Sequence, residues 1–103
     1  MFKISFFVPL EYAEVVKKAV FKEGAGKMEA YADCSWETLG TGQFRPLEGS
    51  DPFIGSSNKL ERVQELKVEM ICVETVIRKV IEALKQSHPY EEPAYEVIKI
   101  ENF

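Results

Sequence analysis

The chain has 103 residues, which is near the common size of a single domain. Apolar residues make up 46% of it, enough to bury a core without disulfide or metal staples. The formal charge of −4 argues against nucleic-acid binding and leaves no polybasic patch for a membrane surface. No apolar run approaches the roughly 20 residues that cross a bilayer, and Ile4–Val8 is too short for a signal peptide. We expect one domain, residues 1–103, in the cytoplasm, with Cys34 and Cys72 reduced and buried.

The first half of the chain predicts a strand, a helix and a second strand. Residues 3–8 are β-prone and stop at Pro9. Residues 10–23 have apolar positions at helical spacing, and glycines 24 and 26 suit the end of that helix. Residues 28–37 alternate between small or apolar and polar side chains, a period of two that is typical of a half-buried strand.

The second half predicts a loop, two strands and a helix. The GTG of residues 40–42 indicates a turn or bulge, and residues 43–47 pair back as a short edge strand that ends near Pro46. Residues 47–59 form a loop rich in Gly, Ser, Asp and Pro, and loops of this length are often functional. A long strand over 61–73, a helix over 75–87 with Thr75 as its cap, and a strand over 94–100 complete the chain.

This order predicts an α+β fold, a ferredoxin-like sandwich with a mainly antiparallel sheet and both helices on one face. The strands carry apolar residues at both parities, for example Phe6 beside Phe7 and Met70 beside Ile71. A monomer would expose the second apolar face, and large exposed apolar patches usually mark an interface. We therefore expect a homo-oligomer.

The segment HPYEEP, residues 88–93, holds the only histidine and two adjacent glutamates. A neutral imidazole at His88 with carboxylates at Glu91 and Glu92 would suit Zn, Cu or another divalent cation. One chain supplies too few ligands for a closed site, so further donors would come from a neighbouring subunit or from the long loop. The alternative is a helix-to-strand turn in which His88 is hydrogen-bonded and the glutamates are solvated.

Other candidate sites are weaker. The segment GTGQFRP lacks a phosphate-loop pattern, although Arg45 would be able to hold an anion; its alternative role is a surface salt bridge. Nucleophilic catalysis has no supporting motif, and a Cys34–His88 pair would require both side chains to be close. We assign no catalytic residue.

Three blocks together resemble the YqfO family: residues 24–55, the strand ELKVEMICV at 65–73, and the ending HPYEEPAYEV at 88–97. This is the CutA/PII-like domain found inserted in the larger NGG-one-interacting-factor-three-like proteins. HPYEEP also resembles the HPYE-type turn of the CutA divalent-cation-tolerance family. The resemblance implies a CutA/PII-like sandwich that assembles as a trimer. The larger family members carry a two-metal site in a flanking domain, so those ligands and any hydrolase activity are not carried over.

The sequence thus favours a non-enzymatic trimeric module that binds a divalent metal or small ligand between subunits. His88 would be the metal donor, Glu91 or Glu92 the carboxylate ligand, and Tyr90 a wall or hydrogen-bond partner, with the 47–59 loop closing over the cleft. The alternative is a pure oligomerisation or protein-interaction scaffold without ligand. A metal-dependent hydrolase fits least, because the only histidine would already serve as a ligand.

Overall fold

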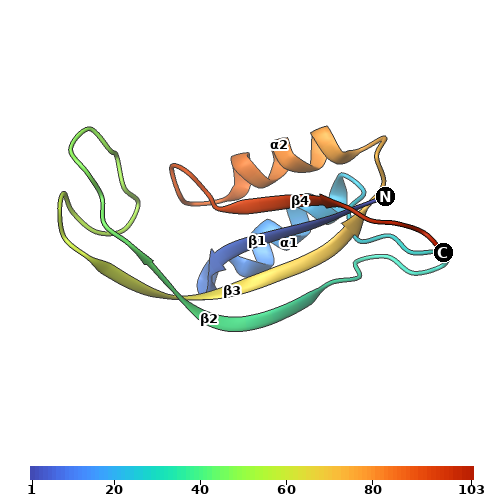
Figure 1. The fold of residues 1–103 in the computed structure, drawn as a ribbon, viewed down its shortest axis with the longest axis horizontal. Helices are drawn as coiled ribbons and strands as arrows, with labels where there is room; N and C mark the ends of the chain where they lie inside the picture. The colour runs from blue at the N-terminus through green and yellow to red at the C-terminus, as the bar shows by residue number, and fades with distance from the viewer.

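The chain folds into a four-stranded antiparallel sheet with both helices on one face (Figure 1). The computed structural model describes residues 1–103. Its elements are β1 (Phe2–Pro9), a 3₁₀ turn (Leu10–Tyr12), α1 (Ala13–Lys22), β2 (Trp36–Phe44), β3 (Glu61–Cys72), α2 (Ile77–Ser87) and β4 (Tyr95–Lys99). The strands lie in the order β2-β3-β1-β4, and every neighbouring pair is antiparallel. The predicted ferredoxin-like α+β sandwich is therefore confirmed.

One core lies between the sheet and the helices. Alternate residues of the two central strands, β1 and β3, point toward the helices and are fully or almost fully buried. The helices contribute buried residues three and four positions apart, as an amphipathic helix does. The core residues are Ile4, Phe6, Val8, Ala13, Val16, Val20, Ala25, Val68, Met70, Cys72, Val80 and Leu84.

The strand predicted over residues 28–37 is wrong. Glu29 and Asp33 have φ values of 53° and 57°, in the left-handed region that a strand does not contain, and Met28 forms a tight bridge with Tyr31. The alternation in this segment is misleading because residues 27–33 are exposed and have no sheet face to cover. Of the two cysteines, only Cys72 is buried, whereas Cys34 is partly exposed.

The second strand instead begins at Trp36 and runs without interruption through the GTG segment to Phe44. The turn at 40–42 and the separate short strand at 43–47 are therefore also wrong. Glycine lowers strand propensity, but β2 is paired along its whole length with β3, and this pairing prevails over the local preference. Helix α2 begins at Ile77 and has no side-chain cap, so the prediction of Thr75 as its cap fails too.

The face of the sheet opposite the helices is uncovered, as the sandwich architecture predicts (Figure 1). The expectation that this face is apolar is only partly met, because β1 and β3 place Lys3, Ser5, Lys67 and Glu69 on it. It is not uniformly apolar, because Glu69 lies at its centre and pairs with Lys3 at 2.7 Å. Trp36 on β2 and Ile98 on β4 are large side chains that remain mostly solvent-exposed on this face. No helix is long and apolar enough to span a membrane.

Gly26 is a position where the fold tolerates only glycine. Its φ is +75°, and a Cβ there would lie 2.7 Å from the carbonyl oxygen of Cys34. Gly49 also has a positive φ, +93°, but a Cβ there would meet nothing within 4 Å. A substitution at either position would thus strain the backbone, but only at Gly26 would the new side chain also collide with a neighbouring atom.

We predict that Gly26→Ala destabilises the protein by about 2–4 kcal/mol, whereas Gly49→Ala costs about 1 kcal/mol. Urea denaturation of both variants and the parent gives the comparison. Equal losses would show that the carbonyl of Cys34 moves aside without cost.

Candidate functional site

The site forms where β4 is too short to cover β1. Strand β4 begins opposite Phe6, so the last residues of β1 have no strand on that side. The segment of residues 88–94, which links α2 to β4 and is called here the HPYEEP turn, lies against this part of β1. The backbone N–H of Phe7 donates to the carbonyl of Ala94 at 3.3 Å. The carbonyl oxygen of Phe7 is contacted by a side chain instead of a strand.

That side chain is His88, which is only 6% exposed. Its Nε2 lies 2.7 Å from the carbonyl oxygen of Phe7, and its Nδ1 accepts the backbone N–H of Tyr90 at 3.1 Å. Because Nδ1 accepts, Nε2 carries the proton and donates to Phe7. Burial lowers the pKa of His88, opposed by the hydrogen bond to Phe7 and the charge of Glu65. The imidazole is therefore neutral and bound at both nitrogens.

Tyr90 extends from the HPYEEP turn to the uncovered face of the sheet. Its hydroxyl donates to Oε2 of Glu65, on β3, at 2.6 Å. Burial, followed by the hydrogen bond and charge of Glu65, raises the pKa of Tyr90 well above its usual range. The ring also packs 5.9 Å from that of Phe44 and 5.0 Å from that of His88, measured between centroids.

Gly42 of β2 makes room for the Glu65 carboxylate. Its missing side chain is the reason, because a Cβ on Gly42 would overlap both the Oε1 and the Cδ atoms of Glu65. Gly40, two residues earlier on the same strand, faces open space instead. The GTG segment thus contributes to the site because Gly42 has no side chain that would displace the Glu65 carboxylate.

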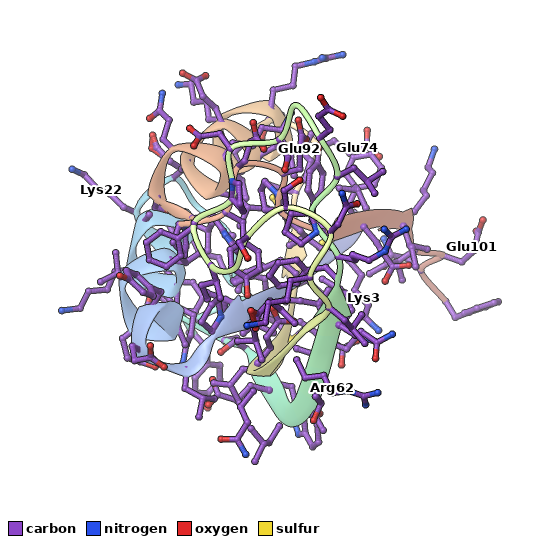
Figure 2. All side chains as sticks on the ribbon, turned by 90° about the vertical axis from the view of Figure 1, so that its left-hand side faces the viewer. Lys3, Lys22, Arg62, Glu74, Glu92 and Glu101 are labelled. Carbon is purple, nitrogen blue, oxygen red and sulfur yellow. The ribbon has the colours of Figure 1, made fainter.

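The loop that joins β2 to β3, residues 45–60, folds back against the HPYEEP turn. Its two ends are tied together where Arg45 donates to the side-chain oxygen of Asn58 at 3.1 Å. Its middle is held by the backbone N–H of Asp51, which donates to Glu91 at 3.0 Å. Figure 2 views the molecule from the end where this loop lies and shows Glu92 beside it.

These parts enclose an open groove of about 990 Å³ on the uncovered face of the sheet. Strands β2 and β3 form its floor, and the loop and the HPYEEP turn form its walls. Its aromatic side chains are Phe7, Phe44, Phe53 and Tyr90, and its charged side chains are Arg45, Glu65, Lys67, Glu69, Glu91 and Glu92. Such a concave, partly apolar surface with a few convergent polar groups is typical of ligand sites.

The structure brings some of the predicted site residues together and separates others. Tyr90, Glu91, Glu92 and Arg45 all line the groove, whereas His88 lies behind it. Within this chain no three His, Cys, Asp or Glu side chains converge as metal ligands. Arg45 forms the hydrogen bond to Asn58 and no salt bridge.

Sequence reasoning missed Glu65, the most enclosed carboxylate of the groove. Glu65, Lys67 and Glu69 alternate along β3 and together are typical of a solvated strand face. Glu65 lies opposite Gly40 in the register of β2 and β3, and its carboxylate reaches diagonally to Gly42. Only this contact distinguishes Glu65 from its neighbours.

Solved structures share this fold. The CutA protein of Pyrococcus horikoshii aligns with a TM-score of 0.71 and 23% identity, over 100% of this chain and 87% of that one. The PII-like protein CutA of Nostoc aligns with a TM-score of 0.69 and 16% identity, over 99% of this chain and 83% of that one. The fold is therefore that of the CutA and PII-like proteins.

A sequence relationship is found with longer proteins. The chain is 43% identical to a GTP cyclohydrolase 1 type 2 homolog of Halalkalibacterium halodurans, over 99% of this chain and 27% of the relative. A Bacillus cereus protein related to NIF3 aligns with a TM-score of 0.83 and 42% identity, over 98% of this chain and 26% of that one. The chain is thus homologous to one segment of the NIF3-related proteins, the YqfO family, and spans about a quarter of their length. No protein-family model matches it.

The contact between Gly42 and Glu65 generates a first prediction for the site. We expect Gly42→Ala to destabilise the fold by about 1–3 kcal/mol, since the added methyl group displaces the Glu65 carboxylate. Gly40→Ala, on the same strand, is expected to be neutral or to stabilise by about 0.5 kcal/mol. Chemical denaturation measures both, and a Gly42→Ala variant as stable as the parent would contradict the close fit.

The two hydrogen bonds of His88 generate a second prediction. His88→Ala leaves the carbonyl of Phe7 and the N–H of Tyr90 unpaired, so we expect a loss of about 2–4 kcal/mol. His88→Gln retains a donor near the Nε2 position and His88→Asn an acceptor near the Nδ1 position, so each is expected to recover part of the loss. Thermal and urea unfolding of the three variants tests this order.

The lowered pKa of His88 also predicts a pH dependence. The unfolded chain takes up a proton on His88 near pH 6.5, whereas the folded chain does so only at lower pH. The free energy of unfolding is therefore expected to decrease as the pH falls from about 6.5 to 5. In His88→Asn this decrease disappears, since the chain has no other histidine. An unchanged slope in the variant would contradict the assignment.

Proposed function

We propose that this chain is a non-enzymatic, homo-oligomeric module of the cytoplasm that binds a small ligand in the groove between the β2–β3 loop and the HPYEEP turn. The groove itself is the observation that carries the proposal, since it combines aromatic walls with convergent charged side chains. The name of the relatives refers to GTP cyclohydrolase homologues, but the chain matches only about a quarter of their length. No activity is inferred from that name.

The uncovered sheet face supports the homo-oligomeric part of the proposal. Trp36 is 66% exposed there, and Ile98 is 52% exposed. Strands β2 and β4 are both edges of the sheet and have no strand on their outer sides. A second copy of the chain would cover apolar surface and protect these edges at once. A trimer is the form that the family resemblance favours.

The absence of a catalytic role is proposed because the only histidine and the buried cysteine are unavailable for chemistry. Both nitrogens of the only histidine are held in internal hydrogen bonds. Cys72 is buried, and burial raises its pKa, so its thiol is protonated and shielded. Neither residue meets the requirements of a nucleophile or a general base.

A metal-binding form of this function remains a prediction. The residues of one chain do not fit a metal, because His88 has no free nitrogen and Glu91 accepts the N–H of Asp51. Glu91 and Glu92 would supply carboxylates only together with donors from a second chain. A ligand-free scaffold is the other alternative. The exposed Trp36 and Ile98 of the uncovered face support the scaffold as well as they support the binding module.

Native mass spectrometry of protein purified without chelator or histidine tag tests the assembly and the metal together. We expect an oligomer, and we expect Trp36→Glu to shift it toward monomer by placing a charge on the uncovered face. Val15→Glu is the matched control, because Val15 is similarly exposed but lies on α1, on the helical side.

The outcomes separate the alternatives. A parent protein that is monomeric at micromolar concentration would overturn the homo-oligomer. If Trp36→Glu and Val15→Glu both dissociate the oligomer, the uncovered sheet face is not specifically its interface. Divalent metal that is bound to the oligomer and lost on chelation would favour the metal form. A metal-free oligomer with no ligand under any condition would favour the scaffold.

A further inference from the structure

Glu65 is a buried carboxylate that has no cationic partner within the chain. It is only 8% exposed, yet it forms none of the protein's ion pairs. Its single hydrogen bond comes from the neutral hydroxyl of Tyr90, at Oε2. Glutamates are rarely this buried unless they are paired, because removing the charge from water is costly. We therefore expect the Glu65 carboxylate to interact with a cationic group from outside the chain.

The second oxygen of Glu65 is the atom that faces such a partner. Oε1 accepts no hydrogen bond from this chain, yet no enclosed side-chain nitrogen or oxygen atom lacks a partner. Oε1 must therefore be in contact with open space. Since Glu65 lines the groove, this space is the groove, and Oε1 reaches it because Gly42 has no side chain in its place.

The surroundings of Glu65 favour a cation over an anion. The groove is lined by four carboxylates and two basic side chains. Lys67 is already paired with Glu69, at 3.9 Å, and Arg45 donates to the neutral side chain of Asn58, so the lining keeps an excess of negative charge. A cation is therefore favoured over an anion by the net charge of the lining.

The groove also has a place for the apolar part of a ligand. Phe7, Phe44 and Tyr90 line it together with Glu65, and the rings of Phe44 and Tyr90 pack against each other. Aromatic faces attract organic cations as well as apolar groups. A carboxylate beside aromatic walls is thus suited to an ammonium head attached to an apolar body.

We propose that the groove binds a small organic cation, a primary ammonium or guanidinium compound with an aromatic or aliphatic body, and that Oε1 of Glu65 accepts its charged N–H. This inference rests on the proposed small-ligand function and names the chemical class of the ligand. Tyr90 acts as a positioning residue, because its hydrogen bond fixes the orientation of the carboxylate and leaves Oε1 directed to the groove. Glu65 contributes the charge, and the aromatic side chains contribute the contact area.

The test uses three probes of the same shape and different charge: 2-phenylethylammonium, 2-phenylethanol and phenylacetate. Calorimetric or NMR titration of the full chain measures their dissociation constants at low salt. We expect the ammonium compound to bind at least tenfold more tightly than the alcohol and the carboxylate to bind most weakly. Chemical-shift changes are expected at the N–H groups of Gly42 and Tyr90.

Glu65→Gln keeps the volume and the acceptor for Tyr90 but removes the charge, so we expect it to weaken ammonium binding about tenfold. Glu96→Gln is the matched control. It removes the same charge from β4, outside the groove, and is expected to change the affinity less than twofold.

Each outcome of the titration decides the inference. Equal binding of the alcohol and the ammonium compound, or an unchanged affinity in Glu65→Gln, would overturn it and leave an apolar ligand groove in place. The inference would also be overturned if no probe binds and the oligomer dissociates when Glu65 is changed. A basic side chain of a second copy would then be the partner of Glu65. Ammonium binding to a monomer would support the inference while contradicting the proposed assembly.

Discussion

The imidazole of His88 connects the end of α2 to the sheet, and the site depends on this connection. It donates to the carbonyl of Phe7, which β4 leaves without a strand partner, and it accepts the N–H of Tyr90. A buried backbone carbonyl without a partner would be costly, so the side chain replaces the missing strand. The same contact sets the path of residues 88–94 and so determines where Tyr90 and Glu91 emerge.

Two further constraints follow from that path. Tyr90 reaches the uncovered face, where its hydroxyl orients Glu65, and Glu91 accepts a backbone N–H of the β2–β3 loop. The long loop is therefore held against the turn by a contact between segments 40 residues apart. Each contact uses a different residue of the HPYEEP turn. The polar side chains of His88, Tyr90 and Glu91 therefore all form hydrogen bonds within the chain. These bonds favour a structural role for His88, which lies outside the groove lining, whereas Tyr90, Glu91 and Glu92 line the groove as well.

The fold was largely predictable, because its strongest sequence signals coincide with buried elements. The sequence predicts the strand at 3–8, the strand at 61–73 and the helix at 75–87 to within about two residues of their observed bounds. The weak point was the segment from 28 to 47, where β2 is mostly exposed and carries two glycines. An exposed edge strand has little apolar periodicity, so its position depends on pairing with β3.

The candidate site was predictable only in part. HPYEEP was recognisable as unusual from its composition, and Tyr90 and the two glutamates do line the groove. The partners of His88 were not predictable, because Phe7 lies 81 positions away and contributes only a backbone carbonyl. Glu65 was indistinguishable in sequence from the solvated charges beside it on β3.

By itself, the sequence determined the class of fold and the location of an unusual turn. These properties follow from local periodicity and composition, which act over a few residues. The tertiary structure alone decided that the histidine is internally bound, that a glycine of β2 admits the carboxylate of Glu65, and that the groove lies between a loop and a turn. Each of these depends on strand register and strand length, which bring together residues that are distant along the chain.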